Sequence, residues 1–207
     1  MGHYENIFVI RLITLSILLI ISLSSCKSIY FYNWKDIDCS FDDSIKEQDR
    51  KLNMNDTIST DSLSVNILRI DAAYAKIVTY NYKKIQKVLV YDENFNLSNC
   101  YFLGIHYDSK VDIGNEYYFD KHGNIIQTIN TDKGYNICWK QAIYIGDMYT
   151  HKKRSIIYPK TWLEKKQNSK KNTWRYFYTN KKNKRRVIVI NGNNGKVMKT
   201  LDVQTDY

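Results

Sequence analysis

From residue 64 onward, apolar and polar side chains alternate along the chain with a period of two residues. The stretches SVNILRI (64–70) and YAKIVTYNY (74–82) show this alternation, which is typical of strands that bury one face. Two longer runs, KVLVYDENFNLSNCYFLGIHY and NEYYFDKHGNIIQTIN, place turn-forming clusters at residues 92–96 and 120–124. Asp and Asn bond to the backbone in turns, and Gly123 allows a positive φ. The pattern therefore predicts antiparallel hairpins.

One amphipathic helix is expected between residues 136 and 152. The residues at helical spacing are Trp139, Ala142, Ile143 and Tyr149. Asn136 is the expected N-cap, and the cations at 152–154 suit the C-terminal end of the helix dipole. Pro159 prevents any continuation, and residues 161–167 are interpreted as one further helical turn.

The chain then returns to strand-like segments, TWRYFYTN, RVIVING and KVMKTLDV. The predicted fold class is α+β: an antiparallel β-hairpin sheet with one main amphipathic helix, preceded by a cleaved signal peptide and a tether. The folded domain is expected over residues 63–207. Its expected core consists of Ile67, Ile70, Val88, Val90, Phe102, Tyr118, Ile125, Trp139, Ile143, Trp174, Val187, Val189 and Val197.

The start of the chain has a different character. The run from Leu12 to Leu23 is almost wholly apolar over 12 residues, whereas a spanning helix needs about 20. This length is typical of the hydrophobic region of a signal peptide. The next residues, Leu23-Ser24-Ser25-Cys26, resemble a bacterial lipobox. The resemblance implies cleavage of residues 1–25, a covalent lipid on Cys26 and a mature chain of 207 − 25 = 182 residues. Two or three acyl chains would hold such a protein stably on a membrane.

Residues 26–62 are expected to form the lipidated tether, because they are mostly polar and lack a sustained period. By resemblance to known lipoproteins, Lys27 after the cysteine favours the outer membrane, and the lack of acidic residues before Asp36 favours its periplasmic face. Three tripeptides in the tether resemble the Asp-Ser/Thr-aliphatic O-glycosylation motif of exported Bacteroidota proteins. The resemblance implies glycans on Ser44, Thr57 and Ser62; an ordinary turn-rich linker is the alternative.

The formal net charge is +10, and residues 152–186 hold 14 Lys or Arg against one acid, Glu164. A basic stripe with aromatic residues can bind nucleic acid through its phosphates. A lipid-anchored exported protein rarely meets nucleic acid, so no nucleic-acid partner is expected. Anionic glycans, peptidoglycan or lipid headgroups are the expected partners of such a patch, and a solvated surface is the alternative.

No catalytic residue and no metal site is expected. Apart from Cys26, the cysteines are Cys39, Cys100 and Cys138, which fit either one disulfide and one free thiol or three free thiols. Cys100, His106 and Asp108 could form a nucleophile group, although lone Cys and His residues on strands are more often structural. Residues 92–103 match an EF-hand loop at its first three ligand positions but lack its Gly and its final Glu, which excludes that interpretation.

Two segments resemble known families. Residues 114–139 resemble a recurrent piece of exported Bacteroidota proteins, a hairpin of the MORN or antitoxin-repeat kind. The matching residues are Tyr117-Tyr118-Phe119-Asp120, Gly123-Asn124 and Asp132-Lys133-Gly134-Tyr135. Residues 136–202 are similar to a PepSY domain, with Asn191 and Asn194 where Asp and Thr are usual. The residues that match are Trp174, Val187, Val189, Gly195 and Val197. PepSY domains are thought to bind peptides or restrain peptidases, so the resemblance implies binding and not catalysis.

The expected function is therefore that of a membrane-anchored envelope lipoprotein. It would act as a non-catalytic binding or structural module that recognises a peptide, protein or glycan through sheet edges and exposed aromatic residues. The alternative is an immunity or inhibitor protein directed against an exported toxin or peptidase. A hydrolase is the least favoured class, because the chain lacks GxSxG, HExxH, paired-Cys and glycine-rich phosphate motifs. Apart from the lipid on Cys26, no cofactor is expected.

Overall fold

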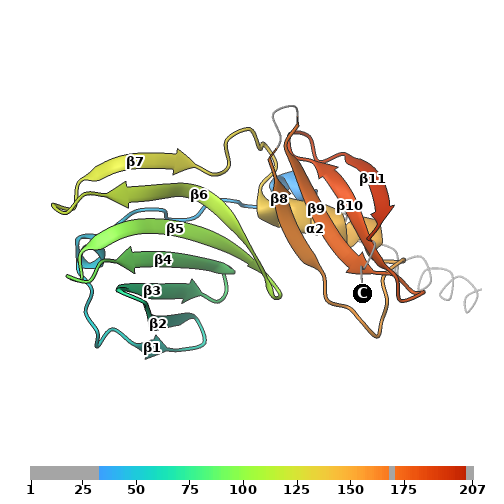
Figure 1. The fold of residues 1–207 in the computed structure, drawn as a ribbon. Coiled ribbons are helices and arrows are strands. Elements are labelled where there is room, and N and C mark those ends of the chain that lie inside the picture. Colours follow the sequence, from blue (N-terminus) through green and yellow to red (C-terminus); the bar gives the residue numbers. More distant parts are fainter. Residues whose placement is uncertain (1–32, 168–170, 204–207) are drawn as a thin grey trace, which may run out of the picture. The chain divides into compact units, whose positions relative to one another are not determined.

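A computed structural model describes residues 33–167 and 171–203 (Figure 1). The chain divides into two compact units, residues 1–36 and 37–207. In the first unit only residues 33–36 are described, and they contain the short 3-10 helix η2 (Trp34–Asp36). The described part of the second unit consists of two antiparallel sheets, the α-helix α2 and the short 3-10 helix η3 (Glu47–Asp49). The α+β fold class is confirmed.

The larger sheet has seven strands that are neighbours in the sheet in the same order as in the chain. The strands are β1 (Ile58–Ser59), β2 (Leu63–Ile70), β3 (Ala73–Tyr80), β4 (Ile85–Tyr91), β5 (Leu97–His106), β6 (Ser109–Phe119) and β7 (Ile125–Asn130). Each strand pairs antiparallel with the next, so every connection is a hairpin. The predicted hairpins around residues 92–96 and 120–124 are both present (Figure 1).

One turn design recurs in three of the hairpins. In each, the side-chain oxygen of Asp92, Asp120 or Asn180 accepts hydrogen bonds from the backbone amides two and four residues later, at 2.8–3.0 Å. The third residue after each of them has a positive φ, of 63°, 81° and 58° respectively. A turn that ends in a left-handed residue matches the twist of the flanking strands. The Asp92 side chain therefore shapes the turn of a hairpin.

The smaller sheet has four strands in the order β11-β10-β9-β8. The strands are β8 (Trp162–Lys166), β9 (Thr173–Thr179), β10 (Arg185–Asn191) and β11 (Val197–Asp202). The helix α2 (Trp139–Thr150) packs against β9 and β10. Gly146 allows this close approach, because a Cβ at that position would overlap the ring of Tyr176 on β9.

Two predictions in this region are wrong in detail. The N-cap of α2 is Cys138, whose amide bonds to the Gln141 side chain at 3.0 Å, and Asn136 instead donates its amide to the carbonyl of Gly192. Residues 162–166 form strand β8 and not a helical turn. Their side chains alternate in exposure, and Leu163, which is 1% exposed, pairs with Tyr176. Burial of Leu163 between strands outweighs the weak local preference for helix.

The expected core is confirmed in part. Six of its members are buried: Val88, Phe102, Trp139, Trp174, Val187 and Val189. Five are only half-buried: Ile67, Val90, Tyr118, Ile143 and Val197. Ile70 and Ile125 do not belong to the core, because their side chains are 54% and 49% exposed. The alternation identified the faces of the strands but not which face would be covered.

The chain before β2 covers one face of the seven-stranded sheet. Residues 37–62 belong to the same compact unit as the sheet, so this part of the expected tether is folded and the domain begins well before residue 63. The ring of Phe41 lies 5.3 Å from that of Phe102, and Leu52 is 8% exposed. Lys87 on β4 pairs with Asp49 in the segment at 2.6 Å. Apolar and ionic contacts together hold the segment on one face of the sheet.

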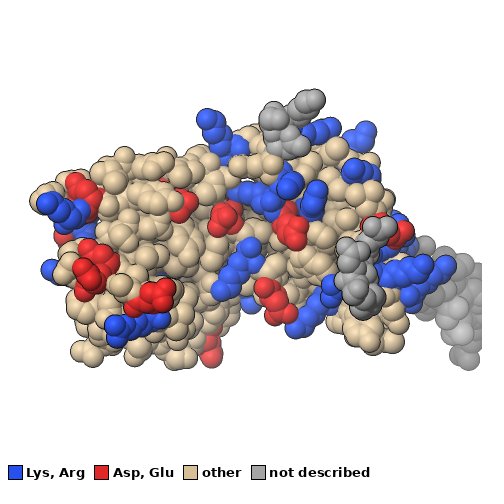
Figure 2. All heavy atoms as spheres, in the orientation of Figure 1, with Lys and Arg blue, Asp and Glu red and all other residues tan. Residues whose placement is uncertain are grey.

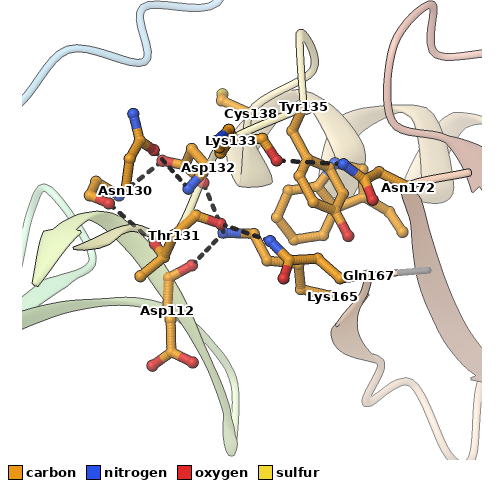
Figure 3. A network of polar contacts seen from close by, with 12 residues as sticks. Asp112, Asn130, Thr131, Asp132, Lys133, Tyr135, Cys138, Lys165, Gln167 and Asn172 are labelled. Carbon is orange, nitrogen blue, oxygen red and sulfur yellow. Dashed lines mark hydrogen bonds and ion pairs between the residues drawn. The ribbon is translucent and has the colours of Figure 1, made fainter. Parts of the chain in front are cut away.

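Lys165 on β8 joins the two sheets (Figure 3). Its ammonium group donates to the carbonyls of Asp112 on β6 and Thr131 after β7, at 2.6 and 2.9 Å, and pairs with the carboxylate of Asp132 at 2.6 Å. Asp132 also accepts the amide of Gly114 at 2.6 Å. The Asp132–Tyr135 element singled out in the sequence therefore has a structural role, as the junction between the sheets.

Candidate functional site

The seven-stranded sheet has one covered face and one open face. Residues directly opposite each other in antiparallel strands project to the same side of a sheet. One such row, Lys87–Phe102–Ile113, is buried beneath residues 37–58. The opposite side has a central row of Ile77, Val88 and Tyr101, in which Ile77 and Tyr101 remain half-exposed. The contrast shows that the described chain covers only one side of the sheet.

The open face carries a row of apolar and aromatic side chains. They are Leu68, Ile77, Val88, Val90, Tyr101, Leu103, Tyr118 and Ile129, and by register they share one side of β2–β7 with polar residues such as Asn99, Glu116 and Gln127. Leu68 and Ile129 at its two ends are 49% and 38% exposed. A large apolar surface that stays in water is typical of an interaction site, because its burial by a partner is favourable. Aromatic residues such as Tyr101 add contact area that loses little conformational entropy.

Two acidic groups lie among the open-face tyrosines. Glu116 accepts hydrogen bonds from the Tyr118 hydroxyl at 2.9 Å and from the Asn99 side chain at 3.0 Å. The bond to Glu116 is the main cause of the raised pKa of Tyr118. Burial, followed by the charges of Asp112 and Glu116, raises the pKa of Tyr101. Both phenols therefore stay protonated near neutral pH and present uncharged hydroxyls to a partner.

The edge strand β7 extends this surface. Among the described residues β7 pairs only with β6, and all six of its side chains are exposed. Its sequence, IIQTIN, contains no charge and no proline, which are the usual devices that protect an edge from pairing. Its unpaired backbone groups can accept an added strand of a partner. The exposed Ile126 and Ile129 would contribute apolar contacts to such a strand.

A cavity of about 610 Å³ lies on the covered side, between residues 46–58 and strands β2–β4. Two ion pairs line it, Lys87 with Asp49 at 2.6 Å and Lys76 with Asp56 at 2.7 Å. Each buried ammonium group already has a carboxylate partner, so the cavity offers a charged ligand little unbalanced charge. These lysines hold the covering segment in place and are not available as nucleophiles.

The Cys100, His106 and Asp108 group does not form a site. Cys100 and His106 lie six residues apart on β5, a separation of about 20 Å along an extended strand. Cys100 is fully buried, and burial raises the pKa of its thiol to about 12. Burial lowers the pKa of His106, whose Nε2 bonds to the Thr161 hydroxyl at 2.7 Å. Asp108 pairs on the surface with Lys160.

The sequence left open whether the three cysteines at 39, 100 and 138 contain a disulfide. Cys39 and Cys138 form a disulfide, and Cys100 is the free thiol among the described residues. The disulfide ties the covering segment to the start of α2 across 99 residues of sequence. Cys26, the predicted lipidation site, lies outside the described residues.

The three predicted O-glycosylation residues, Ser44, Thr57 and Ser62, are all exposed. Two of the aspartates that precede them contact the sheet, since Asp43 accepts from the Tyr117 hydroxyl at 3.2 Å and Asp56 pairs with Lys76. The hydroxyl groups are therefore carried on a fixed segment instead of a free linker. Their modification stays a prediction.

The predicted basic patch is divided by the fold. Figure 2 shows Lys and Arg gathered over the part of the surface that β8–β11 form, whereas both signs of charge mix over the seven-stranded sheet. Lys165 and Arg154 are largely buried in ion pairs with Asp132 and Asp147. The lysines of the β9–β10 turn, in contrast, are exposed. Only part of the patch can therefore meet a partner.

Within residues 33–167 and 171–203, no group of three or more His, Cys, Asp and Glu side chains is arranged to hold a metal ion. No helix in the same part of the chain combines the length and the hydropathy needed to cross a bilayer.

The sequence interpretation expected binding through sheet edges and exposed aromatic residues, but it did not identify the open face or β7 as that edge. A signal for them exists, because IQKVLVY in β4 and CYFLGI in β5 carry apolar residues at both odd and even positions. Comparison with known proteins adds no assignment: no family model matches the chain, and no curated protein or solved structure proves similar to it.

Proposed function

We propose that this chain is a lipid-anchored envelope lipoprotein that acts as a non-catalytic binding module for a protein partner. The partner would lie on the open face of the seven-stranded sheet and add a strand to β7. The single observation that carries the proposal is the contrast between the two faces. Phe102 is 1% exposed, whereas Tyr101 and Ile77 on the opposite side remain partly exposed.

The disulfide supports the proposed location. Disulfides persist in oxidising compartments such as the periplasm, and Cys39–Cys138 joins two segments that the reducing cytosol would leave unlinked. The lipobox-like Leu23-Ser24-Ser25-Cys26 would supply the anchor, on the periplasmic face of the outer membrane. Replacement of Cys26 by Ser should abolish incorporation of an alkyne-tagged palmitate into the full chain. Continued labelling of that variant would overturn the anchor assignment.

Crosslinking from inside the native envelope tests the binding surface. A photoreactive phenylalanine derivative replaces Tyr101 or Leu103 on the open face. The control position is Tyr82 in the β3–β4 turn, whose side chain is 78% exposed. A discrete protein adduct is expected from the two open-face positions and not from position 82. The adduct should disappear when Ile77→Lys places a charge on the same open face, in protein whose circular dichroism shows the native fold. The same adducts from position 82, or none from the open face, would contradict the proposal.

An immunity or inhibitor role is the second candidate, and the hairpins with a shared turn design support it, since the antitoxin-repeat resemblance rests on such a hairpin. The position of α2 against β9 and β10 likewise supports the PepSY-like interpretation of residues 136–202, in which a helix lies across the sheet. The identity of the crosslinked partner separates the candidates. A toxin or peptidase as adduct, together with loss of protection when the chain is deleted, would select the inhibitor role.

A further inference from the structure

The loop between α2 and β8 presents three consecutive large apolar side chains to water. Ile156, Ile157 and Tyr158, here called the apolar loop, are 91%, 74% and 56% exposed. Burial of one isoleucine side chain is worth about 1.5–3 kcal/mol, so a soluble surface rarely gathers such residues without a partner. Nothing in the binding function proposed above uses this loop, which lies beside the four-stranded sheet.

The base of the apolar loop is held in a defined conformation. The amide of Ser155 donates to the carbonyl of Thr179 at the end of β9, at 2.8 Å, and the Ser155 hydroxyl accepts the amide of Tyr158 at 3.3 Å. The amide of Lys181 donates to the carbonyl of Lys153 at 3.0 Å. Ser155 itself is 5% exposed. The loop therefore projects from a firm base instead of collapsing onto the sheet.

The same backbone bonds place a cluster of positive charge beside the base of the loop. Exposed lysines come from the residues just before the loop and from the adjoining β9–β10 turn. They are Lys152, Lys153, Lys181, Lys182 and Lys184, here called the basic collar. In the described part of the chain, two nearby carboxylates are already occupied, since Asp147 pairs with Arg154 at 3.0 Å and Asp108 with Lys160 at 2.9 Å. The collar therefore keeps its positive charge.

We propose that the apolar loop and the basic collar form a docking site for a membrane surface rich in anionic lipid. The two isoleucines would enter the boundary between headgroups and acyl chains, where Tyr158 suits the interface with its apolar ring and polar hydroxyl. The lysines beside the base of the loop would meet the layer of lipid phosphates. Apolar side chains next to a cationic cluster match the layered chemistry of a bilayer.

This inference goes beyond the proposed binding function and does not depend on it. A lipid on Cys26 would nevertheless favour docking, because Ile37 follows Cys26 by only 11 positions. A fully extended segment of that length spans at most about 40 Å. The folded unit would thus stay within reach of the bilayer, and the loop would give it a preferred orientation there.

A fluorescent label on the loop tests docking separately from anchoring. The full chain with Cys26→Ser carries an environment-sensitive dye on a cysteine introduced by Ile157→Cys, or by Tyr82→Cys as control. Vesicles contain phosphatidylcholine alone or with about one-third phosphatidylglycerol, plus lipids that bear a nitroxide quencher. With phosphatidylglycerol we expect a blue shift and quenching at position 157 but not at position 82. High salt should reverse both, because screening weakens the attraction of the collar to anionic lipid.

Charge reversal supplies the matched variant. The double substitution Lys181→Glu, Lys182→Glu should weaken loop insertion about tenfold or more, as judged by the lipid concentration that gives half-maximal quenching. Quenching of equal strength at positions 157 and 82, or no quenching at 157 in phosphatidylglycerol vesicles, would overturn the proposal. A blue shift that increases with protein concentration in the absence of vesicles would also overturn the proposal, because it would indicate that a second copy of the chain covers the loop.

Discussion

The ammonium group of Lys87 lies 2.6 Å from a carboxylate oxygen of Asp49, and side-chain exposures of 6% and 10% leave both groups almost without water. The same ammonium group donates to the carbonyl of Ser44 at 2.8 Å. Lys87 belongs to β4 and the other two residues to the segment that crosses the sheet. This buried cation therefore helps to hold the segment that covers one face of the sheet.

Replacement of Lys87 by Met should destabilise the fold strongly, because it leaves the carboxylate of Asp49 buried without a partner. Loss of one member of a buried ion pair costs about 3–5 kcal/mol of unfolding free energy. Urea unfolding measures this loss. The matched control is Lys160→Met, which breaks the exposed pair with Asp108 and should leave the unfolding free energy almost unchanged. Similar losses in the two variants would show that the covering segment does not depend on the buried pair.

Gly146→Ala should destabilise the protein even though it improves the intrinsic helix propensity of α2. The propensity gain is about 1 kcal/mol, whereas forcing a methyl group into the ring of Tyr176 costs about 1–3 kcal/mol. Thermal unfolding of this variant beside Met148→Ala, at an exposed position of α2, separates the two effects. A higher melting temperature for Gly146→Ala would mean that α2 and β9 pack less closely than the structure shows.

Reduction of Cys39–Cys138 should lower the unfolding free energy by about 4–5 kcal/mol, the chain-entropy value for a loop of this length. The covering segment should loosen first, since its link to α2 is then lost. Urea unfolding with and without a phosphine reductant measures the change. In the Cys39→Ser, Cys138→Ser variant the reductant should have no further effect. An unchanged midpoint in the natural chain would indicate that the two thiols are not joined.

Stability should fall as the solution becomes alkaline. Burial raises the pKa of the Cys100 thiol from 9.0 to about 12 and that of the Tyr135 phenol from 10.0 to about 12. The folded state thus keeps protons that the unfolded state releases, so this contribution is complete below about pH 9 and declines up to about pH 12. Urea unfolding from pH 8 to 11 should show the decline.

Cys100→Ala provides the control for this pH dependence. The variant should lose the part of the decline that begins near pH 9 and keep the part due to the tyrosines. In the folded natural chain the Cys100 thiol should also resist maleimide labelling at pH 8, because it is buried and protonated. Rapid labelling of the native protein at that pH would contradict both expectations.

Much of the local structure could be predicted from residue patterns. The hairpins at residues 92–96 and 120–124 are present because Asp92 and Asp120 organise their turns through bonds within five residues of chain. The helix is present but shorter, since its start is determined by Cys138 and its link to Cys39, a partner 99 residues away. Local propensity carries no information about such a partner.

The candidate site could not be predicted in the same way. Ile70 and Ile125 have the side chains of a core but remain exposed, while the charged Lys76 and Lys87 are buried. The difference depends on where residues 37–58 lie, and their polar composition concealed a covering role. In the sequence Asp49 and Asp56 resemble residues of a polar linker. Only the fold brings them into ion pairs with the lysines of β3 and β4.

The sequence by itself thus determined most of the strands, their turns and the α+β class, because alternation and turn chemistry act between residues close in the chain. Only the tertiary structure decided which face of the sheet is closed, which cysteines pair and which lysines remain free. These outcomes follow from contacts between distant segments, such as Phe41 with Phe102 and Lys165 with Asp132. The surface left uncovered by those contacts is the one proposed to bind a partner.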